Sequence, residues 1–154
     1  MNHTIDINDR ARLKEILHGL DTGTAPLWGK MTARQMVEHL AEQVRWSNGK
    51  KKATCDQPAE AAANSKQKMI YTDAAIPKNI FLETLPEQYA CENIDTAIDQ
   101  LMAELDEFDC YFKAPGVAAV HSGFGPMNQH EWLIWHGKHF THHLVQFGLI
   151  PTGI

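Results

Sequence analysis

The stretch NQHEWLIWHGKHFTHHLVQFG, residues 128–148, predicts a helix and contains five of the nine histidines in the chain. Asn128 precedes Glu131 by three residues, which is the spacing of a helix-capping box with an Asx side chain. Gly148 suits the left-handed residue that ends many helices, and a proline three residues later prevents continuation. We therefore expect the last helix to run from Asn128 to Phe147.

Two histidines of this helix can reach one point in space. His139 and His143 lie about 40° apart around the axis and one turn apart along it. His136 returns to within about 20° of the direction of His143, whereas His142 lies about 100° away and should point elsewhere. Large apolar residues surround the same face: Trp132, Phe140, Leu144 and Phe147. Buried imidazoles without partners there would cost about 1–3 kcal/mol each, and a metal ion that accepts their lone pairs would remove that cost.

A third histidine stands on an earlier predicted helix. Thr32 and Gln35 have capping-box spacing ahead of MVEHLAEQVRW, and His39 lies on or beside the apolar stripe of that segment. The stripe includes Met36, Leu40 and Val44. Three nitrogen ligands suit zinc or a similar cation and leave a position open for water or substrate. The alternative is that these histidines are hydrogen-bonded core residues that hold no ion.

The rest of the chain predicts further helices and no sustained strand pattern. Residues 8–20 read as an amphipathic helix capped by Asn8 or Asp9, and residues 93–112 as a longer one. Residues 49–93 read as a long connection with one short helix, PAEAAANSKQKMIY, and residues 114–126 as a loop rich in glycine and proline. These elements predict a single all-α domain over residues 1–154, organised as a four-helix bundle.

Composition excludes several classes of protein. A chain of 154 residues with 44% hydrophobic residues, 21% charged residues and a net charge of −5 is typical of a globular protein without affinity for nucleic acid. No apolar run approaches the roughly 20 residues of a membrane span, and no secretion signal begins the sequence, which favours the cytoplasm. The lysines at 50–52 read as a solvated loop tip. Cys55, Cys91 and Cys110 read as small buried side chains, with a thiol nucleophile left open.

Two blocks of the sequence resemble the DinB-like superfamily, and in particular a branch of bacterial proteins labelled as a domain of unknown function. They are LWGKMTARQMVEHL and HSGFGPMNQHEWLIWHGKHFTHHLVQFG, and they match in order and spacing. The resemblance covers most of the chain and is weakest from Lys50 to Asn93. It implies a four-helix bundle with a long crossover between the second and third helices, often as a homodimer. The ligands it implies are His39, His139 and His143, holding zinc or nickel, with iron or manganese as further options.

Members of this superfamily resemble transferases that use thiols such as bacillithiol or mycothiol, or metal-dependent hydrolases and isomerases. The resemblance thus implies a metal-dependent thiol S-transferase or hydrolase acting on a small molecule. His136 and Glu42 are candidates for supporting the ligands or transferring protons. His121, at a loop position, is a further candidate for a role at the site, in gating or hydrogen bonding, or is only a turn residue. The alternative is a helical bundle that binds a metal or ligand for a structural or regulatory purpose and catalyses nothing.

Overall fold

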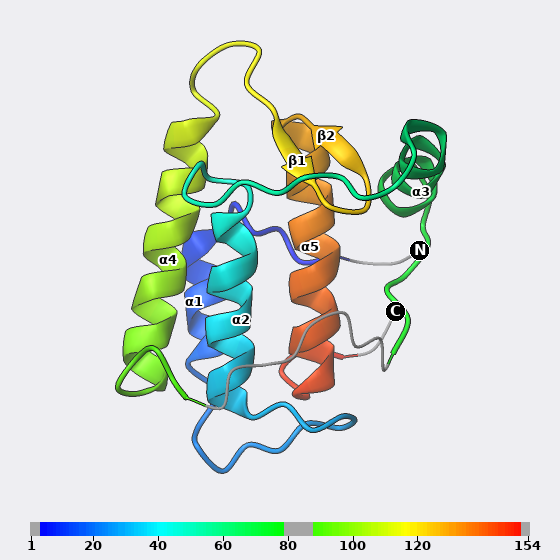
Figure 1. The fold of residues 1–154 in the computed structure, drawn as a ribbon. Helices are drawn as coiled ribbons and strands as arrows, with labels where there is room; N and C mark the ends of the chain where they lie inside the picture. Colours follow the sequence, from blue (N-terminus) through cyan, green and yellow to red (C-terminus); the bar gives the residue numbers. More distant parts are fainter. Residues whose placement is uncertain (1–3, 79–87, 152–154) are drawn as a thin grey trace.

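The computed structural model describes residues 4–78 and 88–151, and its regular structure is mostly helical (Figure 1). Its elements are α1 (Arg10–Leu17), α2 (Ala33–Arg45), α3 (Ala59–Tyr71), α4 (Ile94–Tyr111), β1 (Ala119–His121), β2 (Gly125–Met127) and α5 (Gln129–Gln146). None of the helices in these two ranges combines the length and the apolar character that crossing a bilayer requires.

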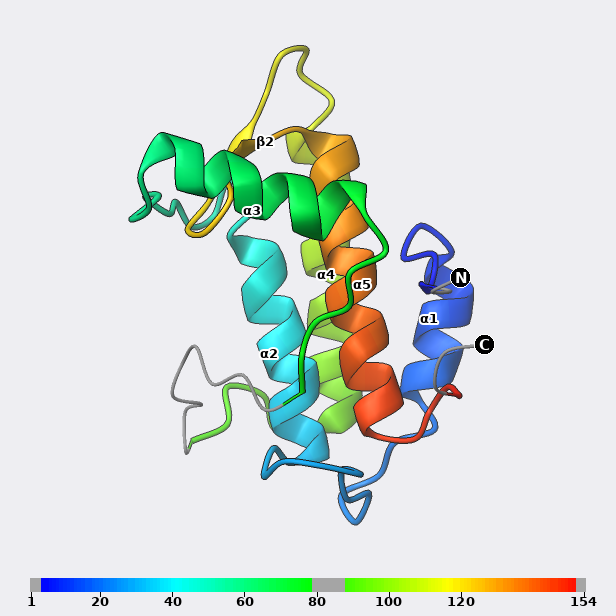
Figure 2. The ribbon, with the colours of Figure 1, turned by 90° about the vertical axis from the view of Figure 1, so that its right-hand side faces the viewer.

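Helices α1, α2, α4 and α5 run alongside one another, whereas α3 lies across one end of this group (Figures 1 and 2). The most extensive interface between helices is that of α2 with α4. Helix α5 contacts α2, and its first half lies beneath α3 and β2. The packing of α2 beside α5 brings together the two helices that carry the predicted ligands.

One hydrophobic core lies between these helices, as the apolar periodicity predicts. Met36, Leu40 and Val44 of α2 are fully buried, and so are Leu101 and Leu105 of α4. Burying each such side chain contributes about 1.5–3 kcal/mol relative to leaving it exposed. The core therefore fixes the rotation of α2 and α5 about their own axes, and with it the direction in which their histidines point.

Helix starts follow the predicted capping residues. Asp9 accepts a hydrogen bond from the Arg12 amide at the start of α1. Both reciprocal hydrogen bonds of a capping box are present between Thr32 and Gln35 at the start of α2. The same pair of bonds joins Asn128 and Glu131 ahead of α5. Local hydrogen bonding thus sets where these three helices begin.

The segment 114–126, predicted as a plain loop, contains most of a β-hairpin, so that prediction is wrong. β1 pairs antiparallel with β2, with Ala119 opposite Met127 and His121 opposite Gly125. Each strand has three residues, too few for an alternating pattern to show in the sequence. The hairpin lies at the α3 end of the molecule and leads directly into α5.

The helix predicted within the long connection is confirmed. Helix α3 covers all but the first residue of the predicted segment PAEAAANSKQKMIY. The stretch 79–87 of this connection lies outside the described residues. Lys50 and Lys51 are exposed, as expected of a solvated tip, but their ammonium groups also pair with Glu104 and Glu42.

The cysteines are not the buried side chains that we predicted. Cys55 and Cys91 are half-buried, Cys110 is exposed, and all three are free thiols. Burial raises the pKa of the Cys91 thiol, and the nearby Glu38 carboxylate raises it further. A raised pKa disfavours the thiolate form that a cysteine nucleophile needs.

Candidate metal centre

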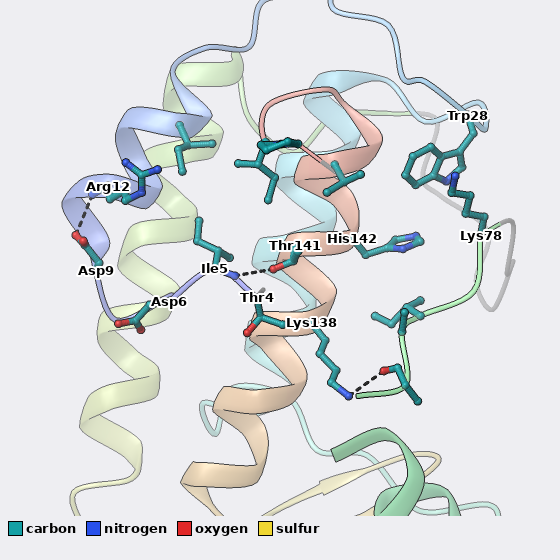
Figure 3. A pocket seen from close by; sticks show the side chains of 17 residues that line it. Thr4, Ile5, Asp6, Asp9, Arg12, Trp28, Lys78, Lys138, Thr141 and His142 are labelled. Atoms are coloured by element: carbon teal, nitrogen blue, oxygen red, sulfur yellow. Dashed lines mark hydrogen bonds between the residues drawn. The ribbon is translucent and has the colours of Figure 1, made fainter. Parts of the chain in front are cut away.

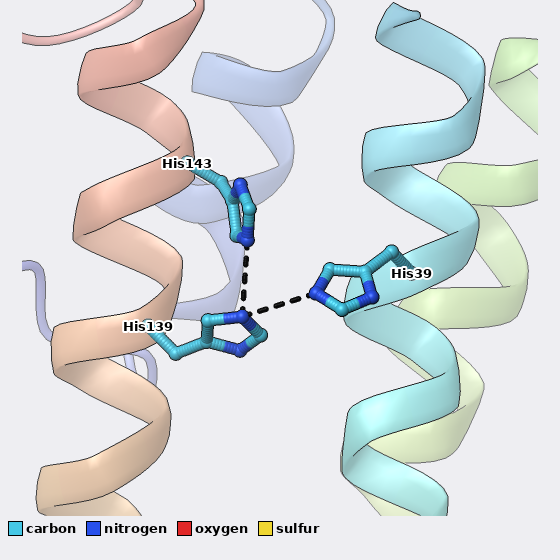
Figure 4. Close-up of side chains that lie close together, drawn as sticks. All are labelled: His39, His139 and His143. Carbon is cyan, nitrogen blue, oxygen red and sulfur yellow. Dashed lines mark hydrogen bonds between the residues drawn. The ribbon is translucent and has the colours of Figure 1, made fainter. Parts of the chain in front are cut away.

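His39 of α2 meets His139 and His143 of α5 in the space between the two helices (Figure 4). The Nε2 atom of His139 lies 3.1 Å from Nε2 of His39 and 3.0 Å from Nε2 of His143. One nitrogen from each ring lies within 4.8 Å of the other two, so the three histidines could hold a metal ion. We call this group the histidine triad.

Local helix geometry places two members of the triad, and packing places the third. His139 and His143 are one turn apart on the inward face of α5, where Phe140 and Leu144 are fully buried. His39 lies on α2 next to the buried Leu40, so its ring points toward α5. His39 and His139 are 100 residues apart in the sequence, and only the packing of α2 against α5 brings their rings together.

Burial keeps the triad rings neutral at pH 7. The pKa of His39 is lowered to about 4, because burial lowers it by more than the nearby Glu42 carboxylate raises it. Burial and, to a lesser extent, neighbouring imidazoles lower the pKa of His143 to about 3 and that of His139 well below 6.5. A neutral imidazole has one N–H donor and one nitrogen lone pair. Each triad ring is therefore in the protonation state that binds metals.

The three neutral rings cannot satisfy one another by hydrogen bonding. His139 Nε2 faces two nitrogens at hydrogen-bond distance, but it either donates its single hydrogen or accepts through its single lone pair. His139 Nε2 can therefore make a full hydrogen bond to His39 or to His143, and not to both. Its Nδ1 atom is buried and has no hydrogen-bond partner among the described residues. A cation at the point where the rings converge would bind all three lone pairs at once.

Gln146 supports the triad, and sequence analysis missed it. Its side chain is buried, with Oε1 2.7 Å from Nδ1 of His143 and with Nε2 donating to the Trp28 carbonyl at 3.0 Å. Histidine ligands commonly use their second nitrogen for such a bond. The signal in the sequence was the i, i+3 spacing of His143 and Gln146 on one helix.

His136, a candidate for supporting the ligands, lies apart from the triad. Its side chain is fully buried, and Nε2 lies 2.7 Å from the Ser47 hydroxyl oxygen. Its ring packs on Trp132 and against the edge of Phe108. Burial and, to a lesser extent, the nearby His121 lower the pKa of His136 to about 3, so this ring is also neutral at pH 7.

Glu42 is half-buried and already engaged with cations. Its carboxylate pairs with Lys51 and, at 3.1 Å, with Arg45. Burial raises the pKa of Glu42, but hydrogen bonds from Lys51 and Arg45 outweigh this effect and the net pKa is lowered. Glu42 is therefore ionised at neutral pH and is a weak base.

His121 closes the turn of the β-hairpin. Its Nδ1 accepts hydrogen bonds from the amides of Gly123 and Phe124 at 3.0 and 3.2 Å, and its ring stacks on Phe124. Burial lowers the pKa of His121 to about 4. Its ring also meets the edge of Trp135, which in turn lies parallel to His139. These contacts indicate a structural contribution to the turn, with an aromatic ring between His121 and the triad.

Two cavities border the helices that carry the triad. The first, which we call the α2 cavity, has a volume of about 630 Å³, and His39, Glu42, Arg45, Lys51 and Cys91 are among the residues that line it. The second, the α5 cavity, has a volume of about 540 Å³ and lies over the outward face of α5 (Figure 3). Trp28, Lys78, Lys138, Thr141 and His142 are among its lining residues. His142 thus lies outside the triad, as the helical phase predicts, with its ring edge-on to that of His143 at a centroid distance of 5.2 Å.

No family model, curated protein or solved structure matches the chain. The resemblance to the DinB-like superfamily therefore stays a prediction. The case for a metal centre depends on the geometry of the triad.

Proposed function

We propose that this chain is a DinB-like metal-binding protein in which His39, His139 and His143 hold one divalent ion. In this proposal α1, α2, α4 and α5 form a four-helix bundle, and the segment with α3 is the crossover between its second and third helices. The observation that carries the proposal is the convergence of three neutral imidazoles whose Nε2 contacts, at 3.1 and 3.0 Å, cannot all be hydrogen bonds. A cation provides the missing partner.

The donor set favours zinc or nickel. All three candidate ligand atoms are imidazole nitrogens, and the group found among the described residues includes no carboxylate or thiolate. Nitrogen ligands of this kind suit zinc, nickel, copper and iron, whereas manganese and magnesium prefer oxygen. Three protein ligands also match the number found in catalytic zinc sites, which keep one position open.

We further propose that the protein is a metal-dependent enzyme, of the thiol S-transferase or hydrolase type, with a small-molecule substrate. A divalent ion with an open position lowers the pKa of a bound water or thiol and so supplies a nucleophile near neutral pH. His39 lines the α2 cavity, whose volume of about 630 Å³ lies within the range of small-molecule sites. In that cavity Arg45 and Lys51 offer cationic groups to a substrate, and Glu42 offers an ionised carboxylate.

A second candidate function is a non-catalytic site in which the metal stabilises or regulates the fold. Its support is the burial of the triad: His139 is 8% exposed and His143 is 7% exposed. His39 is the one triad member among the residues that line the α2 cavity. A closed site of this kind would contribute the free energy of metal binding to folding.

Elemental analysis of the purified protein tests the shared part of both candidates. We expect roughly one zinc or nickel ion per chain, either as purified or after incubation with the metal and removal of the excess. His139→Ala and His143→Ala should abolish uptake, whereas His142→Ala is the matched control and should leave it intact. A wild-type protein that takes up neither metal would refute the proposal.

A substrate screen separates the two candidates. The metal-loaded protein is assayed for transfer of a low-molecular-weight thiol to an electrophile and for hydrolysis of chromogenic esters and amides. The enzyme proposal expects turnover that disappears in His139→Ala and persists in His142→Ala. Metal uptake without turnover, together with a large loss of stability on chelation, favours the non-catalytic candidate instead.

We also propose that the chain forms a homodimer, as the resemblance implies, and that it acts in the cytoplasm, as its free cysteines favour. Light scattering coupled to size-exclusion chromatography measures the mass directly, and a value near the 17.4 kDa of one chain would refute the dimer. Fractionation of the source cells would test the location.

A further inference from the structure

Gln146 and the segment 27–29 together hold one nitrogen of His143 in a defined chemical state. The Trp28 carbonyl oxygen can only accept a hydrogen bond, so the Gln146 amide must turn its NH₂ group toward it. The amide oxygen of Gln146 then faces Nδ1 of His143 at 2.7 Å. Because this oxygen can only accept, Nδ1 of His143 must carry a hydrogen. In the neutral ring the lone pair is therefore on Nε2, the atom that faces His139.

The backbone around Gln146 prevents the amide from turning over. Gln146 is the last residue of α5, and its carbonyl accepts from the Leu27 amide at 2.7 Å. Its side chain donates to the next residue of the same segment, Trp28. Gly29 follows with a φ of +80°, and a Cβ built on it would lie 3.1 Å from Gln146 Nε2. The backbone at Gly29 thus lies close to the Gln146 amide, and its positive φ favours glycine.

Residues 27–29 hold the backbone and side chain of Gln146, and the side chain in turn contacts His143; we call this arrangement the clamp. It differs from ordinary capping of a helix end. The carbonyls of His143, Leu144 and Val145 accept from amides that follow on the same chain segment. Gln146 alone among the last four residues of α5 takes its partner from the distant 27–29 segment, through both backbone and side chain. The additional bond from its side chain goes to a triad histidine.

We propose that Gln146 is a positioning residue that fixes the Nδ1–H tautomer of His143 and so keeps its Nε2 lone pair directed into the triad. The role in metal binding rests on the proposed function, but the tautomer does not. Without the amide oxygen, His143 could place its hydrogen on Nε2, which would block the atom that is to bind the metal. His139 has no corresponding partner for its Nδ1 among the described residues, so the clamp acts on one ligand only.

Nitrogen-15 NMR of the metal-free protein tests the tautomer. Long-range correlation spectra of labelled histidine distinguish Nδ1–H from Nε2–H rings, and we expect wild-type His143 to be Nδ1–H. In Gln146→Leu the signal should move to Nε2–H or to a mixture. Gln146→Glu keeps an acceptor and should restore Nδ1–H, although it loses the bond to Trp28. Thr141→Val is the matched control, because it also removes a side-chain bond that ties a distant loop to α5, and it should leave the His143 signal unchanged.

Zinc titration of the same variants tests the consequence for binding. We expect Gln146→Leu to weaken zinc affinity by about 10-fold or more, as is typical for loss of a ligand's hydrogen-bond partner, with Gln146→Glu closer to wild type and Thr141→Val unchanged. A wild-type His143 in the Nε2–H form, or an unchanged tautomer in Gln146→Leu, would overturn the proposal. Unchanged zinc affinity in Gln146→Leu would overturn its role in metal binding. If wild type binds neither zinc nor nickel while the NMR result holds, the proposed function fails and the tautomer assignment stands.

Discussion

Replacing His139 with leucine should leave the stability of the metal-free protein nearly unchanged and remove its response to zinc. His139 is 8% exposed, and its Nδ1 is buried without a hydrogen-bond partner among the described residues. Leucine has a similar volume and no polar atom, so it fits the same space without that cost. The substitution also removes a metal ligand, so it should abolish the stabilisation that zinc provides.

The magnitudes follow from the contacts of this ring. Removing a buried polar atom that lacks a partner should gain about 1–3 kcal/mol. The ring of His139 lies parallel to Trp135 at a centroid distance of 5.9 Å, and losing this contact should cost about 0.5–1.5 kcal/mol. The one hydrogen bond that Nε2 can make to His39 or His143 is lost as well, at a cost of about 0.5–1.5 kcal/mol. These contributions nearly cancel, so we expect the stability of the metal-free protein to change by less than about 1 kcal/mol. Zinc at about 100 times its dissociation constant should stabilise wild type by about 2.7 kcal/mol and the variant far less.

Urea denaturation in a chelator and again in zinc measures both effects. The variant should be about as stable as wild type in the chelator and less stable in zinc, by about 2.7 kcal/mol. His142→Leu is the control, because His142 lies outside the triad, and it should respond to zinc as wild type does. If His139→Leu is markedly less stable than wild type in the chelator, the triad is a satisfied part of the core and the reasoning is wrong.

Other perturbations test the electrostatics and the local structure. In the folded protein the pKa of His39 is lowered to about 4 and that of His143 to about 3, chiefly by burial. Just below pH 6.5 these two rings therefore take up protons in the unfolded chain and stay neutral in the folded protein. The free energy of unfolding of the metal-free protein should therefore fall as the pH falls, by about 1 kcal/mol per ring between pH 7 and about pH 5.5. Urea denaturation at each pH measures this change. Glu104→Gln should destabilise the fold by about 1.5–3 kcal/mol in the same assay at pH 7, since it removes a buried carboxylate that pairs with Arg45. Thr32→Ala should cost about 1 kcal/mol in thermal or urea unfolding, because it removes the cap of α2.

The sequence by itself determined those features that depend on neighbours a few residues away. Capping boxes at Thr32 and Asn128 placed the starts of α2 and α5, because a cap is a hydrogen bond between residues three apart. Helical phase put His139 and His143 on one inward face and placed His142 outside the triad, since both relations depend on the rotation per residue alone. The β-hairpin was not foreseen because three-residue strands carry no periodic signal.

Only the tertiary structure decided how distant residues meet. His39 lies 100 residues before His139 in the chain, and their 3.1 Å contact exists because α2 packs beside α5 with a rotation that the core sets. The contact of Gln146 with the Trp28 carbonyl spans 118 residues, so the i, i+3 spacing of His143 and Gln146 could not show that a second segment holds the Gln146 amide. The same holds for His136, which shares the helical face of His143 but bonds to Ser47 from another segment. Helix periodicity specifies a direction around one axis, whereas the partner in that direction depends on which element packs there.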